Sequence, residues 1–329
     1  AAVAVAAQAM ACLPGCSLHR PRWCGRSLAW VSAADSHRLR VRVHQPRTGA
    51  RATALAEPTA GSDEVLRYMP PAKRLPGIGA LAVMRAVSLL VWMYATGCVF
   101  FPMAAISWVF DRLRDPVRRR LVDFVIRTWA RAVVLPFFKV KVEGVENLPP
   151  PGNNCVFVSN HASFMDILSV LHVPRSFKFI SKASIFKIPI IGWTMKAADH
   201  IGLERMDRRS QVEVFRKSVK KLQDGSSLFI FPEGTRSKDS KMLDFKAKGA
   251  FAMAKRSNAP LLPMTILGTG RIMPGGKEYL LYPGGSGVKV VIHKLIPAEE
   301  VQGMDDAELV AQARAAVQSG LPEEYRGDP

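Results

Sequence analysis

A histidine and an aspartate five positions apart, His161 and Asp166, are the residues of this sequence best suited to acid–base chemistry. They stand in "VFVSNHASFMDILSV", residues 156–170, where an apolar run ends. Positions i and i+5 of one α-helix point about 140° apart, so the two side chains meet only if His161 lies in a loop and Asp166 in the helix that follows. Ser163 is placed to cap that helix. A carboxylate on one imidazole nitrogen would fix the tautomer and leave the other nitrogen free as a base.

The sequence offers no protein nucleophile to accompany this base. No serine lies in a GxSxG turn, and none of the five cysteines is suitably placed. The base would therefore act on a hydroxyl group that the substrate brings. Taken alone, a His–Asp spacing of this kind is more often a structural contact at the end of a buried strand, and that alternative stays open here.

A second polar turn follows another apolar run in "LFIFPEGTRSKDS", residues 228–240. Glu233 can accept hydrogen bonds from hydroxyl groups, and Arg236 offers a planar fork that fits a phosphate. Gly234, between them, lets the backbone approach a ligand closely. The structural alternative is a Pro-Glu-Gly turn followed by a solvated arginine.

Both turns belong to a pattern of alternating elements that predicts an α/β fold. Short runs rich in β-branched and aromatic residues indicate strands at 139–143, 155–159, 177–181, 227–231, 260–267 and 288–293. Helical patterns lie between several of them, which favours a mostly parallel sheet flanked by helices. Ligands of such sheets bind beyond the carboxyl ends of the strands, where both polar turns are expected.

The clearest helix is predicted within "RSQVEVFRKSVKKLQDG", residues 209–225. Its apolar residues recur at helical spacing. Ser210 and Glu213 form a capping box at its start, and Gly225 is expected to end it.

Together, "NHASFMD" and "FPEGTRS" resemble the first and third sequence blocks of the glycerolipid acyltransferases, in particular the 1-acylglycerol-3-phosphate acyltransferases. The resemblance extends over residues 139–296. It includes "RSFKFISKASIFKIPIIGW", "RMDRRSQ" and "APLLPMTILGTGRIMP", which are similar to plastid members of the family. It implies a catalytic domain of that fold at 139–329, with neither cofactor nor metal.

The resemblance also implies a role for individual residues. His161 and Asp166 become the catalytic base pair, and Pro263 matches the fourth block. Binding of the substrate phosphate and glycerol falls to Glu233, Gly234, Thr235, Arg236 and Arg205. Contacts to the acyl donor or the phosphate fall to Lys182, Lys246 and Lys248.

Two details depart from the family pattern. Glu204 sets a negative charge directly before Arg205, where family members often carry a non-acidic residue. The segment "FKAKGAF" is one residue longer than usual, which leaves the choice between Lys246 and Lys248 open.

The implied reaction is acyl transfer to the sn-2 hydroxyl of 1-acyl-glycerol-3-phosphate, giving phosphatidic acid. The donor would be a thioester of acyl carrier protein or of coenzyme A. One alternative is a sister enzyme that acylates glycerol-3-phosphate or another lysophospholipid. Another is a non-catalytic, basic, membrane-tethered lipid-binding protein. A nucleic-acid partner is not expected, because the basic residues lack interleaved aromatic stacking positions.

Residues 1–57 contain eight arginines, no lysine and two acidic residues, which is typical of an organellar transit peptide. The alternative is a disordered basic arm that binds nucleic acid. Residues 58–79, rich in Pro and Gly, are predicted to be a linker. With the plastid resemblance, this start predicts a location at a plastid membrane, the envelope in particular.

A membrane-associated helical segment is predicted at 80–138. Residues 86–110 carry no charge, and as a helix they would span about 37 Å against a hydrocarbon core of about 30 Å. Pro102 suggests a kink or a re-entrant bend. The arginines of "DRLRDPVRRR", residues 111–120, follow and suit an anionic bilayer surface, in keeping with the net charge of +19. Residues 117–135 form a two-faced helix that lies either at the membrane interface or on the domain.

The loop "GRIMPGGKE", residues 270–278, resembles a phosphate-binding loop, but the spacing of Gly275 and Lys277 is wrong and Glu278 replaces the required Ser or Thr. The loop is therefore not assigned a role.

Overall fold

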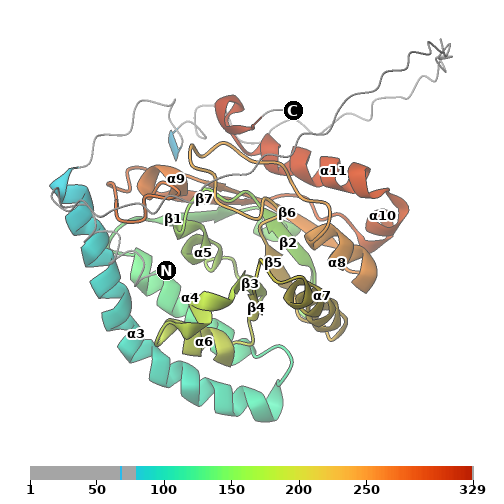
Figure 1. Cartoon of the computed structure of the whole chain (residues 1–329), viewed down its shortest axis with the longest axis horizontal. Helices are drawn as coiled ribbons and strands as arrows, with labels where there is room; N and C mark the ends of the chain where they lie inside the picture. The colour runs from blue at the N-terminus through green and yellow to red at the C-terminus, as the bar shows by residue number, and fades with distance from the viewer. Residues whose placement is uncertain (1–66, 69–78, 328–329) are drawn as a thin grey trace, which may run out of the picture.

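The computed structural model describes residues 67–68 and 79–327, and a seven-stranded sheet forms the core of that part (Figure 1). The strands are β1 (Val140–Glu143), β2 (Val156–Ser159), β3 (Lys178–Lys182), β4 (Ile201–Leu203), β5 (Leu228–Ile230), β6 (Leu261–Leu267) and β7 (Val288–Ile292). Their order is β1-β7-β6-β2-β5-β3-β4, and all pairs are parallel except β6 with β7. The predicted α/β class is confirmed. The predicted transit peptide and most of the linker lie outside the described residues.

The central strands are buried on both faces because helices cover the sheet on both sides. β2 shows how one strand serves two cores. Phe157 packs in a cluster with helices α4 (Arg120–Val134) and α5 (Met165–Val170). Val156 and Val158 point to the opposite cluster, which is formed with α7 (Arg208–Gln223), α8 (Ala250–Ser257), α10 (Ala298–Gly303) and α11 (Asp306–Ser319). Such two-sided burial explains why these strands read as continuous apolar runs.

Several short helices and turns lie in the connections between strands, and one lies near the end of the described chain. They are α6 (Ile191–Ala197) and α9 (Thr269–Ile272), with the 3₁₀ turns η1 (Val145–Asn147), η2 (Ala183–Lys187) and η3 (Glu323–Tyr325). Strand β4 was not predicted from the sequence. It has three residues at the edge of the sheet, and one of them is Gly202, so it carries too little apolar pattern to be recognised.

The predicted capping box of α7, formed by Ser210 and Glu213, is wrong. Asp207 is the N-cap, and its side chain accepts a hydrogen bond from the amide of Arg209. Ser210 instead accepts from the amide of Glu204, and Glu213 pairs with Lys217 one turn later on the helix. A carboxylate three positions earlier thus takes the capping role, since Asp is an equally good N-cap.

The long apolar segment forms α3 (Ala80–Arg114), one continuous helix that contains Pro102. Its axis curves around the domain without turning back on itself, and α4 packs against it (Figure 1). Asp111 joins the pair, because its buried carboxylate accepts hydrogen bonds from the first amides of α4, at Leu121 and Val122. By length and composition, α3 is the one helix in the described part that could cross a membrane.

Helix α4 packs on the domain, as one of the two alternatives for this segment predicted. Val122, Ala130 and Val133 are fully buried. The predicted charged face is not wholly solvated, because Asp123 lies in the interior with its Oδ2 2.7 Å from the Nζ of buried Lys178. A lysine at the start of β3 supplies the counter-charge, a contact that helical periodicity does not reveal.

Candidate active site

His161 and Asp166 meet where β2 ends, as their spacing predicted. His161 lies in the loop after β2, and Asp166 is the second residue of α5. The Nδ1 atom of His161 is 2.8 Å from Oδ2 of Asp166. The same oxygen accepts hydrogen bonds of 2.8 Å from the amides of Ala162 and Ser163, and the carboxyl group is fully buried. With Nδ1 donating to this oxygen, Nε2 of His161 is the nitrogen left to accept a proton.

Three contacts hold the loop that carries His161. Asn160 binds both backbone groups of Ile266 on the neighbouring strand β6, with distances of 2.8 and 2.9 Å. Ser163 accepts a hydrogen bond from the amide of Met165 and donates to the carbonyl of Met273, but the N-cap of α5 is Phe164 and not Ser163 as predicted. The imidazole ring stacks on Phe231, with ring centroids 3.9 Å apart. The histidine is therefore fixed in position before any substrate binds.

Glu233 joins the second motif to the first. Its Oε1 accepts a 2.8 Å hydrogen bond from the amide of His161, while the carbonyl of His161 accepts from the amide of Ser237. Glu233 is only 2% exposed, and Oε2 is buried without a hydrogen-bond partner among the described residues. Burial raises the pKa of Glu233 to about 8. This geometry makes the carboxyl group a support for the His161 backbone.

Gly234 and Lys246 lie against each other in the second turn. Gly234 has φ +73°, a left-handed conformation that favours glycine, and a Cβ there would lie 2.9 Å from Nζ of Lys246. The amide of Lys246 also donates to the carbonyl of Pro232. Both candidate lysines are exposed, but Lys246 is the one placed against the motif, whereas Lys248 lies just before α8. Thr235 is exposed on the same turn.

Arg205 and Lys182 reach the same edge of the sheet through the strand order. β2, β5, β3 and β4 are neighbours and run parallel, so their carboxyl ends lie side by side. Lys182 is the last residue of β3, and Arg205 follows two positions after β4. Both are exposed. The structure therefore brings two cationic side chains to the edge that carries His161.

The structure adds one residue that the sequence had not suggested, Glu278. Its Oε1 lies 2.6 Å from Nη1 of Arg236, the arginine predicted to hold phosphate. The loop that carries it packs on both motifs, since a Cβ on Gly275 would lie 2.3 Å from the carbonyl oxygen of Ser237 and 3.1 Å from that of Ala162. The segment set aside as a false phosphate loop thus forms a third wall of the site. The two adjacent glycines were the only sequence signal of this close packing.

Comparison with known proteins places this geometry in a family. Residues 139–267 match the family model described as Acyltransferase. A 1-acyl-sn-glycerol-3-phosphate acyltransferase of Chlamydomonas reinhardtii is 43% identical over 247 residues, which cover 75% of this chain and 72% of that protein. A chloroplastic 1-acyl-sn-glycerol-3-phosphate acyltransferase of Brassica napus is 40% identical over 279 residues, 84% of this chain and 75% of that protein.

A solved structure has a similar fold. The crystal structure of the 1-acyl-sn-glycerophosphate acyltransferase PlsC from Thermotoga maritima matches with a TM-score of 0.60 and 29% sequence identity. The match covers 75% of this chain and 98% of that protein. The structural similarity therefore extends over most of this chain and is not limited to the two motifs.

Proposed function

The chain belongs to the 1-acyl-sn-glycerol-3-phosphate acyltransferase family and is an enzyme of that type, and we propose how its site performs the transfer. The acceptor is lysophosphatidic acid, bound with its sn-2 hydroxyl at Nε2 of His161. The observation that carries this proposal is the hydrogen bond of Nδ1 to buried Asp166, which leaves Nε2 as the proton acceptor. Because the chain belongs to an enzyme family, the alternative of a non-catalytic lipid-binding protein is set aside.

Proton transfer and acyl transfer occur together in the proposed step. Nε2 of His161 takes the proton of the sn-2 hydroxyl while the hydroxyl oxygen attacks the carbonyl carbon of the thioester. The tetrahedral intermediate then collapses, the C–S bond breaks, and the imidazolium returns the proton to the departing thiolate. General-base catalysis of this kind contributes roughly 10²–10⁴-fold, and correct positioning of the acceptor contributes further. No covalent acyl-enzyme is required.

Arg236 is the proposed anchor of the acceptor phosphate, supported by Arg205 and Lys182 at the neighbouring strand ends. Its ion pair with Glu278 must be exchanged for the phosphate. Two negative groups then compete for one guanidinium, so Glu278 tunes how tightly the acceptor binds. Lys246, next to Gly234, is placed to contact the phosphate or the donor.

The proposed donor is acyl carrier protein at a plastid membrane. Two observations support it: the relative from Brassica napus is chloroplastic, and the chain has 46 Lys and Arg against 27 Asp and Glu. A positive surface favours docking of an acidic carrier protein. The exposed apolar side chains of α3 would hold the enzyme in the membrane, where the acceptor resides.

A panel of acceptors and donors tests this function. The purified full chain in detergent is given lysophosphatidic acid or glycerol-3-phosphate, each with acyl carrier protein or coenzyme A thioesters of the same acyl chain. We expect phosphatidic acid from lysophosphatidic acid, with kcat/KM higher for the carrier-protein thioester. Faster acylation of glycerol-3-phosphate would assign the sister activity, and equal use of both donors would overturn the donor proposal.

A further inference from the structure

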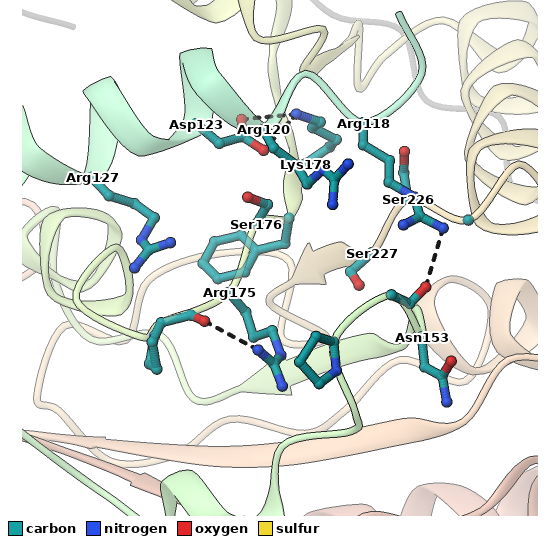
Figure 2. A pocket seen from close by; sticks show the side chains of 15 residues that line it. Arg118, Arg120, Asp123, Arg127, Asn153, Arg175, Ser176, Lys178, Ser226 and Ser227 are labelled. Atoms are coloured by element: carbon teal, nitrogen blue, oxygen red, sulfur yellow. Dashed lines mark hydrogen bonds and ion pairs between the residues drawn. The ribbon is translucent and has the colours of Figure 1, made fainter. Parts of the chain in front are cut away.

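A cavity of about 200 Å³ opens at the edge of the sheet opposite to His161 (Figure 2). It is lined by Lys178, the first residue of β3, by Ser227, which directly precedes β5, and by Asn153, in the loop before β2. His161 follows the other end of β2. Because the four residues of β2 alone span about 13 Å, this cavity is separate from the active site.

Cationic side chains dominate the cavity. Its charged lining consists of Arg118, Arg120, Arg127, Arg175, Lys178 and Asp123. Asp123 is committed to Lys178, and Arg120 pairs with Asp115 at 2.7 Å. In the described part of the chain, Arg118, Arg127 and Arg175 have no carboxylate partner. The arrangement therefore leaves positive charge without a counter-charge inside a concave site.

Backbone carbonyls hold the guanidinium groups of Arg118 and Arg175, and part of the hydrogen-bonding capacity around the cavity stays free. Arg118 donates to the carbonyl of Gly152, and Arg175 donates to the carbonyls of Pro149 and Pro174. The dashed lines of Figure 2 mark the contacts with Gly152 and Pro174. The Nε atoms of Arg127 and Arg175 are buried, and neither finds a hydrogen-bond partner among the described residues. Burial and the nearby charge of Arg131 lower the pKa of Arg127, and Asp123 opposes this shift only in part.

We propose that this cavity binds the phosphate group of an anionic membrane phospholipid. Arginine forks fit phosphate oxygens, and a bound anion would relieve the repulsion between the guanidinium groups. A lipid is the source because the segment that supplies Arg118 and Arg120 directly follows α3, and exposed apolar side chains lie beside its arginines. These apolar side chains are Leu113 at the end of α3, Val117 in the connection, and Leu121 and Phe124 on α4.

Binding of phosphatidylglycerol to the full chain in uncharged detergent micelles, measured by calorimetry, tests the proposal. The cavity variant carries Arg118→Gln and Arg127→Gln, two of the arginines that have no carboxylate partner. Its matched control carries Arg216→Gln and Arg256→Gln, which remove the same charge from exposed positions on α7 and α8. An arginine near a lipid phosphate contributes about fivefold in affinity, so the cavity variant should bind roughly 25-fold more weakly. The control should change less than about twofold, since its arginines lie outside the cavity.

Equal weakening in the two variants would mean a diffuse positive surface and would overturn the proposal. Inorganic phosphate, titrated in a parallel arm, distinguishes the source: binding as tight as that of the lipid, with the same dependence on the cavity arginines, would assign a free-phosphate site instead. If the cavity variant fails to fold, amide hydrogen exchange of the unsubstituted protein, measured with and without phosphatidylglycerol, tests the same proposal. Phosphatidylglycerol should protect residues 151–153 and 225–227, and unchanged exchange there would contradict a lipid in the cavity.

Discussion

At the scale of single residues, the backbone of His161 is what links the two motifs. Its amide donates to Glu233 and its carbonyl accepts from the amide of Ser237, so the second motif holds the backbone of His161 through both of its polar groups. Glu233 thus positions the backbone of His161. This arrangement makes the protonation state of Glu233 matter for stability.

The burial of Glu233 predicts a pH-dependent stability. The pKa of Glu233 is about 8 in the folded protein, whereas an ordinary glutamate has a pKa of 4.5, so between these limits the folded state binds more protons than the unfolded state. Stability should therefore be highest below pH 4.5 for this group and fall as pH rises toward 8, by up to about 1.4 kcal/mol per unit. Denaturant unfolding from pH 5 to 8 measures this slope. Glu233→Gln should flatten it, and an unchanged slope in that variant would contradict the assignment.

Glu278 is predicted to weaken acceptor binding by occupying Arg236. In Glu278→Gln the guanidinium is released from its ion pair, so KM for lysophosphatidic acid should fall about two- to fivefold with kcat nearly constant. Steady-state kinetics measures both, and Glu299→Gln, an exposed carboxylate on α10, is the matched control. A higher KM would instead show that Glu278 holds Arg236 in its binding position.

At the scale of elements, the loop after α9 is predicted to fix the geometry between the motifs. Gly275→Ala would place a Cβ 2.3 Å from the carbonyl oxygen of Ser237, a backbone atom that cannot move without displacing the second motif. We expect a loss of about 1–3 kcal/mol in stability and a marked loss of kcat. Thermal unfolding and turnover measure these effects. Gly303→Ala, at a position with open space, should change neither, and a fully active Gly275→Ala enzyme would argue against this packing.

The elements that could be predicted from sequence are those whose pattern is dictated by burial. β2 and β6 are buried along their length, so their apolar runs mark them, and the spacing of His161 and Asp166 then implies a strand–loop–helix unit. Contacts between distant residues left no such pattern. The pair of Asp123 with Lys178 and the pair of Arg236 with Glu278 each join segments more than 40 positions apart. Both pairs depend on how the elements pack, and local periodicity does not carry that information.

At the scale of the whole molecule, α3 presents one face to the domain and another to its surroundings. Leu89 is 4% exposed, whereas Val91 is 62% exposed, although both lie on the same helix. A charge at the outer position should weaken membrane attachment without unfolding the domain, because the side chain makes no contribution to the core. A charge at the inner position, Leu89, should instead destabilise the domain.

Liposome flotation and thermal unfolding of Val91→Asp and Leu89→Asp test this division. Val91→Asp should float less completely than the unsubstituted chain and unfold at nearly the same temperature. Leu89→Asp should lose several degrees of thermal stability, because a charge is buried without a partner. Loss of stability in both variants would show that the outer face of α3 also packs on protein.

The most direct test of the proposed chemistry is His161→Ala, with turnover and acceptor binding measured on the same preparation. In the proposed step His161 acts on the acceptor hydroxyl, whereas the proposed phosphate anchor is Arg236, on a different strand end. We predict that phosphatidic acid formation falls by roughly 10²–10⁴-fold while the affinity for lysophosphatidic acid changes less than about twofold. Turnover close to that of the unsubstituted enzyme, or a loss of binding as large as the loss of turnover, would contradict the role of His161 as the base.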